Sequence, residues 1–235
     1  MKPNHPLRAL GRTVVASLPK PVSEALRGAK RSLLNQRQAS DVFRRIYKNN
    51  EWDGTESISG PGSTLAATTG PRAVLPGLIE QLGVHTLLDI PCGDAHWIST
   101  CLPEGVAYIG GDIVPELVER NRRTCASFGT FAVLDLVSDE LPRADLLLVR
   151  DCFIHLPNAM VRKAIANIRR APITYLLTTT FPNETTLTDI ELGGYRPINL
   201  TLREFGLPPP LLVSLDEDGV RANGKSLGLW RVGEI

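Results

Sequence analysis

The stretch HTLLDIPCGDAHW, His85 to Trp97, decides the fold predicted for this chain of 235 residues. Thr86 to Ile90 is an apolar run with one acid inside it, Asp89, and is typical of a buried strand. The turn Pro91-Cys92-Gly93-Asp94 breaks the run, and we expect a helix from about Ala95. A strand, a tight turn and a helix start in this order form an anchor for a nucleotide-sized ligand, because backbone N–H groups and Gly93 allow close approach.

The alternation of strand and helix continues beyond this turn, which indicates a mostly parallel sheet with right-handed crossovers. After Phe181 the alternation stops, and two short strands around Asp216-Glu217-Asp218-Gly219 predict a closing hairpin. The strands are expected at Tyr108–Asp112, Phe131–Leu136, Ala144–Val149, Ile173–Thr180, Leu211–Leu215 and Leu227–Val232; the helices run from Pro115 to near Gly129 and onward from Pro157-Asn158, the latter with Val161, Ile165 and Ile168 inward.

Two helices are expected between residue 40 and the first strand. Ser40-Asp41 would cap one, whose apolar side holds Val42, Phe43, Ile46 and Tyr47. Pro71–Leu82 would be the other, and Pro76 inside it implies a kink or two short pieces. The loop between them, NNEWDGTESISGPGS at 49–63, is of a length that is often functional. It could equally be a surface connection in which Trp52 plugs the core.

Charge is unevenly distributed along the chain. Residues 1–50 hold 11 Lys and Arg against two acids, a balance of +9, whereas the remaining 185 residues hold 15 against 23, a balance of −8. The acidic remainder argues against nucleic acid as a partner. The basic arm, residues 1–39, is either a peripheral contact with an anionic membrane or a protein partner, or a loosely docked arm with a solvated face.

Cysteine and hydropathy patterns point to a cytoplasmic protein. The four cysteines, at 92, 101, 125 and 152, form no CxxC pair and have no histidine at metal spacing, so we expect reduced thiols and no metal. No apolar run approaches the length of a membrane span, and the N-terminus lacks the apolar core of a signal peptide.

These motifs together resemble the class I S-adenosylmethionine-dependent methyltransferases. The resemblance rests on LLDIPCGD, on Asp112 and Asp135 after the second and third strands, on VRDCFIHL after the fourth and on the closing hairpin. WDGTESISGPGS and GYRPINLTLREFGLPPP are also similar to a bacterial subgroup of that family. The resemblance implies an α/β, Rossmann-like, seven-stranded sheet in the order 3-2-1-4-5-7-6, with strand seven antiparallel and helices on both faces, in a methyltransferase domain spanning residues 40–235.

The resemblance also implies which residues bind S-adenosylmethionine. Asp89, Pro91, Cys92 and Gly93 match the first motif, although Pro91 and Ala95 stand where glycines are usual. A cofactor without a pyrophosphate fits this departure, because it needs less close backbone approach. Asp112, about 20 residues past the turn, matches the acid that accepts hydrogen bonds from the ribose hydroxyls. Asp135 matches the acceptor for the adenine amino group, Leu136 would lie beside the ring, and Arg150 completes the cofactor set.

The reaction would be in-line methyl transfer, for which the enzyme mostly aligns the partners and excludes water. An oxygen acceptor must also lose a proton, and His155 and Asp151 at the exit of the fourth strand are the candidate catalytic residues. His155 could instead simply pack beneath the site. The acceptor, a small polar molecule such as a sugar or glycolipid, would contact four residues: Trp52, Glu56, Tyr195 and Arg196.

Two other functions remain open at this point. A nicotinamide-dependent oxidoreductase or epimerase would need G-x-G-x-x-G after the first strand, where this chain has P-C-G-D-A-H. A non-catalytic protein with a cofactor fold could act as a partner or scaffold.

Overall fold

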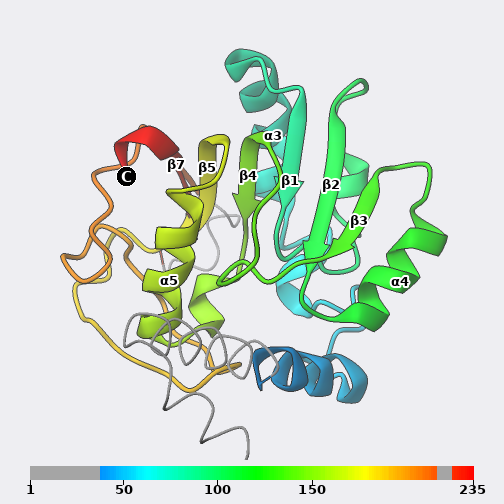
Figure 1. Cartoon of the computed structure of the whole chain (residues 1–235), viewed down its shortest axis with the longest axis horizontal. Coiled ribbons are helices and arrows are strands. Elements are labelled where there is room, and N and C mark those ends of the chain that lie inside the picture. The colour runs from blue at the N-terminus through cyan, green and yellow to red at the C-terminus, as the bar shows by residue number, and fades with distance from the viewer. Residues whose placement is uncertain (1–37, 216–223) are drawn as a thin grey trace, which may run out of the picture. The chain divides into compact units, whose positions relative to one another are not determined.

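The computed structural model describes residues 38–215 and 224–235 (Figure 1). Contacts divide the chain into Met1–Ala39 and Ser40–Ile235, and the second unit contains every strand described. The arm predicted at residues 1–39, apart from its last two residues, and the hairpin turn predicted at 216–219 lie outside the described residues.

Seven strands form one sheet in the order β3-β2-β1-β4-β5-β7-β6. Strands β1 to β5 run parallel to one another, whereas β7 runs antiparallel to both β5 and β6. This order and orientation confirm the predicted fold. The strands are β1 (Thr86–Asp89), β2 (Ala107–Asp112), β3 (Thr130–Val133), β4 (Ala144–Val149), β5 (Ile173–Thr180), β6 (Leu212–Leu215) and β7 (Ser226–Arg231).

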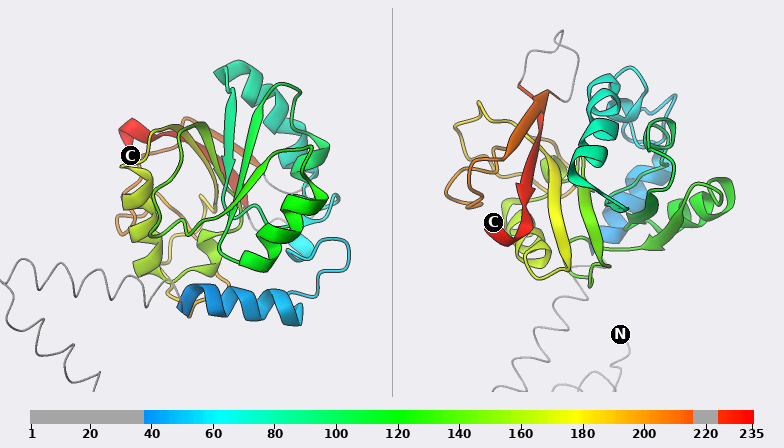
Figure 2. Two further views of the ribbon diagram at one scale, coloured as in Figure 1. Left: turned by 45° about the vertical axis from the view of Figure 1, so that its right-hand side comes forward. Right: turned by 90° about the horizontal axis from the view of Figure 1, so that it is seen from above.

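Helices cover both faces of the sheet, α3 and α5 lying on opposite sides (Figure 2). The alternation of side chains along each strand produces two cores. Leu147 and Val149 of β4 pack with Val161, Ile165 and Ile168 on α5, as predicted, whereas Leu146 and Leu148 of the same strand pack with α3 on the other face. The helices are α3 (Thr69–Leu82), α4 (Pro115–Thr124) and α5 (Asn158–Ile168); the short 3-10 helices are η1 (Pro61–Ser63), η2 (Ile98–Thr100), η3 (Phe153–His155) and η4 (Val232–Glu234).

The helix predicted from Ala95 is wrong. Between the β1 turn and β2 the chain forms turns and the three-residue η2. Ala95 itself adopts a left-handed φ of 53°, which an α-helix cannot include. The hydroxyl groups of Ser99 and Thr100 donate to nearby backbone carbonyls, competing with a longer helix.

Three further helices also differ from the prediction, in where they begin or end or in whether they are continuous. Ser40 does not cap its helix but lies inside it, since residue 38 is already helical, and its hydroxyl donates to the Ile113 carbonyl. Helix α3 is one continuous helix that contains Pro76, not two pieces. Helix α4 ends at Thr124, short of Gly129, which instead packs so tightly on Tyr108 that a Cβ there would lie 2.7 Å from its ring.

The helix through residues 40–49 lies at the carboxyl edge of the sheet, drawn in dark blue in Figure 1. Arg44 forms an ion pair with Glu116 at the start of α4. On the same helix, Ile46 is buried and Phe43 packs against the α5-side core, so the predicted docking of this helix on the domain is confirmed. Within the described residues, no helix is both long and apolar enough to cross a membrane.

Candidate cofactor and acceptor site

The turn after β1 is held to the neighbouring elements by its backbone. The Cys92 N–H donates to the Gly111 carbonyl (2.8 Å), and the Gly93 N–H donates to the Asp112 carboxylate (3.2 Å). Asn121 on α4, which is 1% exposed, donates its amide to the Gly93 carbonyl (2.7 Å). The turn is thereby rigidly placed at the sheet's carboxyl edge. Asn121 was not predicted, because its role depends on a helix packing against a turn.

Two buried acids stand beside this turn. Asp89 accepts a hydrogen bond from the Tyr108 hydroxyl (2.8 Å), and burial raises its pKa to about 7. Asp112 accepts from the Gly93 and Val114 N–H groups, yet burial still raises its pKa to about 6. A carboxylate offers about four acceptor sites, and the N–H groups of Gly93, Val114 and Ile113 do not use all of those on Asp112.

Asp135 follows β3 and completes the series of acids at successive strand ends. Its carboxylate accepts from the Val137 N–H (2.8 Å) and the Ser138 hydroxyl (2.7 Å), and burial raises its pKa. Leu136 beside it is buried in the α5-side core. A nucleoside bound at this edge would find carboxylates at the ends of β2 and β3, which could accept hydrogen bonds from its two ribose hydroxyls and its amino group. The residues present fit S-adenosylmethionine.

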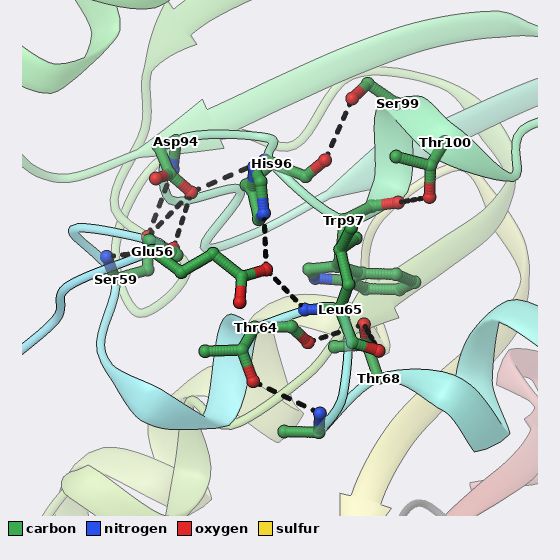
Figure 3. A network of polar contacts seen from close by, with 12 residues as sticks. Glu56, Ser59, Thr64, Leu65, Thr68, Asp94, His96, Trp97, Ser99 and Thr100 are labelled. Carbon is green, nitrogen blue, oxygen red and sulfur yellow. Dashed lines mark hydrogen bonds and ion pairs between the residues drawn. The ribbon is translucent and has the colours of Figure 1, made fainter.

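The loop upstream of α3 lies directly on the turn (Figure 3). Asp94 accepts hydrogen bonds from the Ser57 hydroxyl (2.9 Å), the Ile58 N–H (3.0 Å) and the Ser59 hydroxyl (3.3 Å). Ser57 is 1% exposed, so this is a buried attachment. The sequence signalled the loop and the turn separately but did not show that Asp94 joins them.

Glu56 belongs to the same network. Its carboxylate accepts from the Leu65 N–H (2.7 Å) and contacts His96 Nε2 (2.8 Å), which lowers its pKa (Figure 3). The structure therefore uses Glu56 to fasten the loop. The sequence predicts that Glu56 contacts an acceptor, but the function proposed below does not use that contact.

Charged residues meet at the exit of β4. Arg150 donates to the Gly62 carbonyl (2.9 Å), and its guanidinium lies 5.5 Å from the Trp97 ring centroid. Asp151 has a left-handed φ of 53°, and its carboxylate accepts from Lys225 Nζ (2.8 Å) and the Thr179 hydroxyl (3.2 Å). Burial would raise the pKa of Asp151, but the charges of Arg150 and Lys225 outweigh it and lower the pKa. Asp151 is thus kept ionised, as an orienting group would be.

His155 ends η3 and is half-buried. Its Nδ1 lies 2.7 Å from the Gly194 carbonyl oxygen. A carbonyl oxygen only accepts, so Nδ1 carries the proton and a neutral ring holds its lone pair on Nε2. Burial lowers the pKa of His155, with the Gly194 hydrogen bond and Asp151 opposing.

Aromatic rings surround His155. The Trp52 ring stacks on it, with centroids 4.9 Å apart and planes at 26°. Tyr195 lies 6.2 Å away at 55° and is 58% exposed, and the Phe43 and Trp52 ring centroids are 6.3 Å apart. The structure therefore brings together three of the predicted catalytic and acceptor residues: His155, Trp52 and Tyr195.

Arg196 lies close in sequence to Tyr195 but has a different environment. It is 3% exposed, and its guanidinium donates to four protein oxygens: Thr188 O (2.9 Å), Phe153 O (2.8 Å), Leu156 O (2.9 Å) and Asn158 Oδ1 (2.6 Å). These bonds use four of its five N–H donors. Contact with an acceptor, predicted for Arg196, is accordingly not part of the function we propose.

Comparison with known proteins bears on the fold. No protein-family model and no curated protein matches this chain. One similar solved structure is the methyltransferase domain of bacterial CtHen1-C, with a TM-score of 0.55 at 12% identity, covering 72% of this chain and 100% of that one. Another, an S-adenosylmethionine-dependent methyltransferase from Clostridium acetobutylicum, has a TM-score of 0.53 at 10% identity and covers 71% and 92%.

A third similar structure is magnesium protoporphyrin IX methyltransferase from Synechocystis with bound S-adenosylmethionine. Its TM-score is 0.51 at 14% identity, covering 81% of this chain and 95% of that one. Together with the strand order, these similarities show that the chain has the fold of the class I S-adenosylmethionine-dependent methyltransferases.

Proposed function

We propose that this protein is an S-adenosylmethionine-dependent methyltransferase. One observation carries the proposal: in this fold, Asp89, Asp112 and Asp135 stand at the ends of β1, β2 and β3, and Asp112 is hydrogen-bonded to the glycine of the turn. Ligands of open α/β sheets bind outside the carboxyl ends of the strands, where the order reverses. Here that point lies between β1 and β4, beside the turn.

The turn also argues against a nicotinamide cofactor. A dinucleotide places its pyrophosphate on the N-terminus of an α-helix that follows the first strand. In this chain η2, three residues long, is the only helical element between β1 and β2. A cofactor without phosphate groups has no need of such a helix.

We further propose that the methyl group passes to an oxygen of a small polar acceptor such as a sugar or glycolipid. Bound S-adenosylmethionine supplies a methyl group already activated by its sulfonium. The chain then has to align the acceptor, exclude water and remove one proton. His155 suits the last task, because its Nδ1 is held by Gly194 and Nε2 is the proton-accepting atom.

Neighbouring residues would orient the acceptor. Tyr195 offers an exposed aromatic face beside His155, on which the apolar face of a sugar ring can stack. Asp151, ionised at the exit of β4, can accept a hydrogen bond from an acceptor hydroxyl or from the amine of the cofactor. Trp52 backs the histidine ring.

Titration of the full chain separates the possible functions. We expect micromolar binding of S-adenosylmethionine by calorimetry and no comparable binding of NADH; the reverse result would favour an oxidoreductase. Turnover with a panel of hydroxylated acceptors, guided by mass spectrometry of metabolites that co-purify, separates an enzyme from a scaffold. Cofactor binding without turnover on any oxygen, nitrogen or carbon acceptor would support the non-catalytic alternative.

We also propose that the protein is cytoplasmic and that residues 1–39 contact the anionic face of the inner membrane. The +9 balance of residues 1–50 supports this, since each basic residue near an anionic surface adds about 1 kcal/mol of attraction. A full-length variant with Arg27, Lys30 and Arg31 changed to glutamine should co-sediment less with anionic liposomes, most clearly at low salt. Equal co-sedimentation of both proteins would contradict the idea. We also propose that the chain belongs to the bacterial methyltransferase subgroup that WDGTESISGPGS and GYRPINLTLREFGLPPP resemble; the similarity of these two stretches supports this.

A further inference from the structure

The hydrogen bond between His155 and Gly194 depends on a second chain segment. His155 lies in η3, after β4, whereas Gly194 lies in the irregular segment between β5 and β6. The bond joins Nδ1 to a carbonyl oxygen over 2.7 Å and 39 residues of sequence. Its geometry is therefore set by whatever fixes residues 193–196 against η3.

Backbone contacts alone fix this segment at two points. The Gly193 N–H donates to the His155 carbonyl (3.0 Å), and the Arg196 N–H donates to the Ile154 carbonyl (3.1 Å). Gly194 lies between these two bonds, so its carbonyl is presented to the histidine ring over a short, doubly anchored stretch. Gly193 has a φ of 85°, a conformation that side chains with a Cβ rarely adopt.

The Arg196 guanidinium supplies a further attachment, beside the bond that the Asn158 N–H donates to the Asp189 carboxylate (2.8 Å). It bonds to the carbonyls on either side of His155 in η3, those of Phe153 and Leu156, and to Asn158 at the start of α5. Its Nε bonds to Thr188 within its own segment. One buried side chain thus fastens the segment that carries Gly194 to the element that carries His155.

The second restraint on the histidine ring is an aromatic face. Trp52 stacks on His155 at 4.9 Å and 26°, close to parallel, and the Phe43 ring lies 6.3 Å from that of Trp52. Stacking on Trp52 limits the tilt of the imidazole plane. The hydrogen bond at Nδ1 fixes how the ring is turned within that plane. The two restraints act on different degrees of freedom.

We propose that Arg196 and Trp52 are positioning residues that hold His155 in the Nδ1-protonated tautomer and in one ring orientation, leaving Nε2 to accept the acceptor's proton. In this arrangement a backbone carbonyl performs the orienting task that a carboxylate performs in a Ser-His-Asp triad. The inference rests on the proposed function for its catalytic meaning, but the tautomer itself is a property of the free protein.

The charges around the ring are compatible with this role. Asp151 favours the protonated ring, whereas Lys225 and Arg196 disfavour it, and Tyr195 is the other titratable group near the ring. The hydrogen bond to the ring joins Nδ1 to the Gly194 carbonyl oxygen (2.7 Å). The tautomer is therefore decided by the Gly194 carbonyl.

Nitrogen-15 NMR of the imidazole ring tests the tautomer in the full chain without cofactor or acceptor, at a pH well above the histidine pKa. The His155 signals are assigned by their loss in His155→Gln. We expect a single tautomer protonated at Nδ1. In Arg196→Lys, whose single ammonium cannot reach four separate acceptors, we expect a mixture of tautomers, at least a tenfold loss of turnover and cofactor affinity within twofold. Arg203→Lys, the same change at an exposed arginine of the same segment, is the matched control.

Trp52 provides the second variant, which decides the matter if Arg196→Lys fails to fold. Trp52→Phe should keep one tautomer, because an aromatic face remains, whereas Trp52→Leu should broaden the His155 signals and lower turnover. A wild-type ring protonated at Nε2, or folded Arg196→Lys and Trp52→Leu proteins that keep one Nδ1-protonated tautomer and full turnover, would overturn the inference. Its failure is distinct from that of the proposed function: a chain that does not bind S-adenosylmethionine overturns the function, whatever the tautomer.

Discussion

Ser59 lies over Gly93 so closely that a Cβ added at Gly93 would stand 2.1 Å from the Ser59 hydroxyl oxygen. The glycine was predicted to make room for a ligand. In the structure the close approach is made by the protein's own upstream loop, and Gly93 also has a left-handed φ of 54°. The glycine requirement therefore has two separate components, backbone conformation and contact with Ser59.

Gly93→Ala should destabilise the protein through both components. We expect a loss of about 2–4 kcal/mol in the free energy of unfolding, measured by urea denaturation. Gly105→Ala is the matched control, because Gly105 has a φ of 85° but nothing within 4 Å of its added Cβ. It should lose only the conformational part, about 1–2 kcal/mol. Equal losses in the two variants would show that Ser59 does not restrict the turn.

Asp94→Asn should release the loop from the turn. An amide has one acceptor oxygen where the carboxylate has two, so it cannot serve the Ser57 hydroxyl and the Ile58 N–H in their present geometry. We expect hydrogen exchange of the Ile58 amide to accelerate at least tenfold. Asp53→Asn, at an exposed position of the same loop, is the control and should leave that rate unchanged. An unchanged rate in Asp94→Asn would mean that other contacts hold the loop.

Local sequence predicted the central strands well. Ala144–Val149 and Ile173–Thr180 were predicted with the bounds that the structure shows, because both segments are rich in apolar or β-branched residues that favour a largely buried strand. The helix expected from Ala95 failed, since the left-handed conformation of Ala95 and the hydroxyl bonds of Ser99 and Thr100 have no strong local signal.

The candidate site was predictable where it depends on strand ends and not where it depends on distant contacts. The positions of the acids at the ends of β1, β2 and β3 can be predicted from where each strand ends in the sequence. The sequence predicts Glu56 and Arg196 as acceptor contacts, but it does not show the hydrogen bonds that each side chain makes within the protein. Arg196 bonds to residues about 40 positions away, such as Leu156 and Asn158, and no local pattern encodes that.

Asp112→Ala should weaken binding of S-adenosylmethionine by about 1.5–3 kcal/mol, through loss of charge-assisted hydrogen bonds to the ribose. Isothermal calorimetry measures the change. Asp145→Asn is the control, because Asp145 accepts from the His85 and Thr86 N–H groups at the opposite end of β1. Unchanged affinity in Asp112→Ala would rule out the ribose assignment.

Asp89 makes stability depend on pH. Its pKa is raised to about 7 in the folded protein, against about 3.9 in an unfolded chain, so the folded state binds the extra proton between these values. The stability from this group is fully present below pH about 4 and is lost as pH rises through about 7. Asp89→Asn, which can still accept from Tyr108, should remove this loss and be more stable than wild type at pH 8, by roughly 1–4 kcal/mol.

Urea denaturation at pH 5 and pH 8 measures this effect. The difference in unfolding free energy between the two pH values should shrink in Asp89→Asn but not in Asp145→Asn, whose carboxylate lies at the other end of β1. A pH dependence identical to wild type in Asp89→Asn would show that Asp89 is ionised in the folded protein at neutral pH.

His155 provides the test of catalysis. Strand β4 neighbours β1 in the sheet, so residues just past Val149 lie next to the turn that follows β1. The acids after β2 and β3 lie on the other side of that turn. If His155 is the base, His155→Ala should lower turnover by about 10²–10⁴ while leaving the affinity for S-adenosylmethionine within twofold. His155→Asn should be nearly as slow, because it preserves the approximate shape but cannot take the proton.

The pH profile separates a base from a packing residue. A base works in its neutral form, so wild-type turnover should fall at acidic pH, and burial places that limb below the ordinary histidine pKa of about 6.5. Both His155 variants should lose the limb, whereas His96→Asn, which changes the histidine paired with Glu56, should keep it. If His155→Asn retains most of the activity with the wild-type profile, the histidine only packs against Trp52, and Asp151, held ionised by Arg150 and Lys225, becomes the candidate to orient the acceptor in its place.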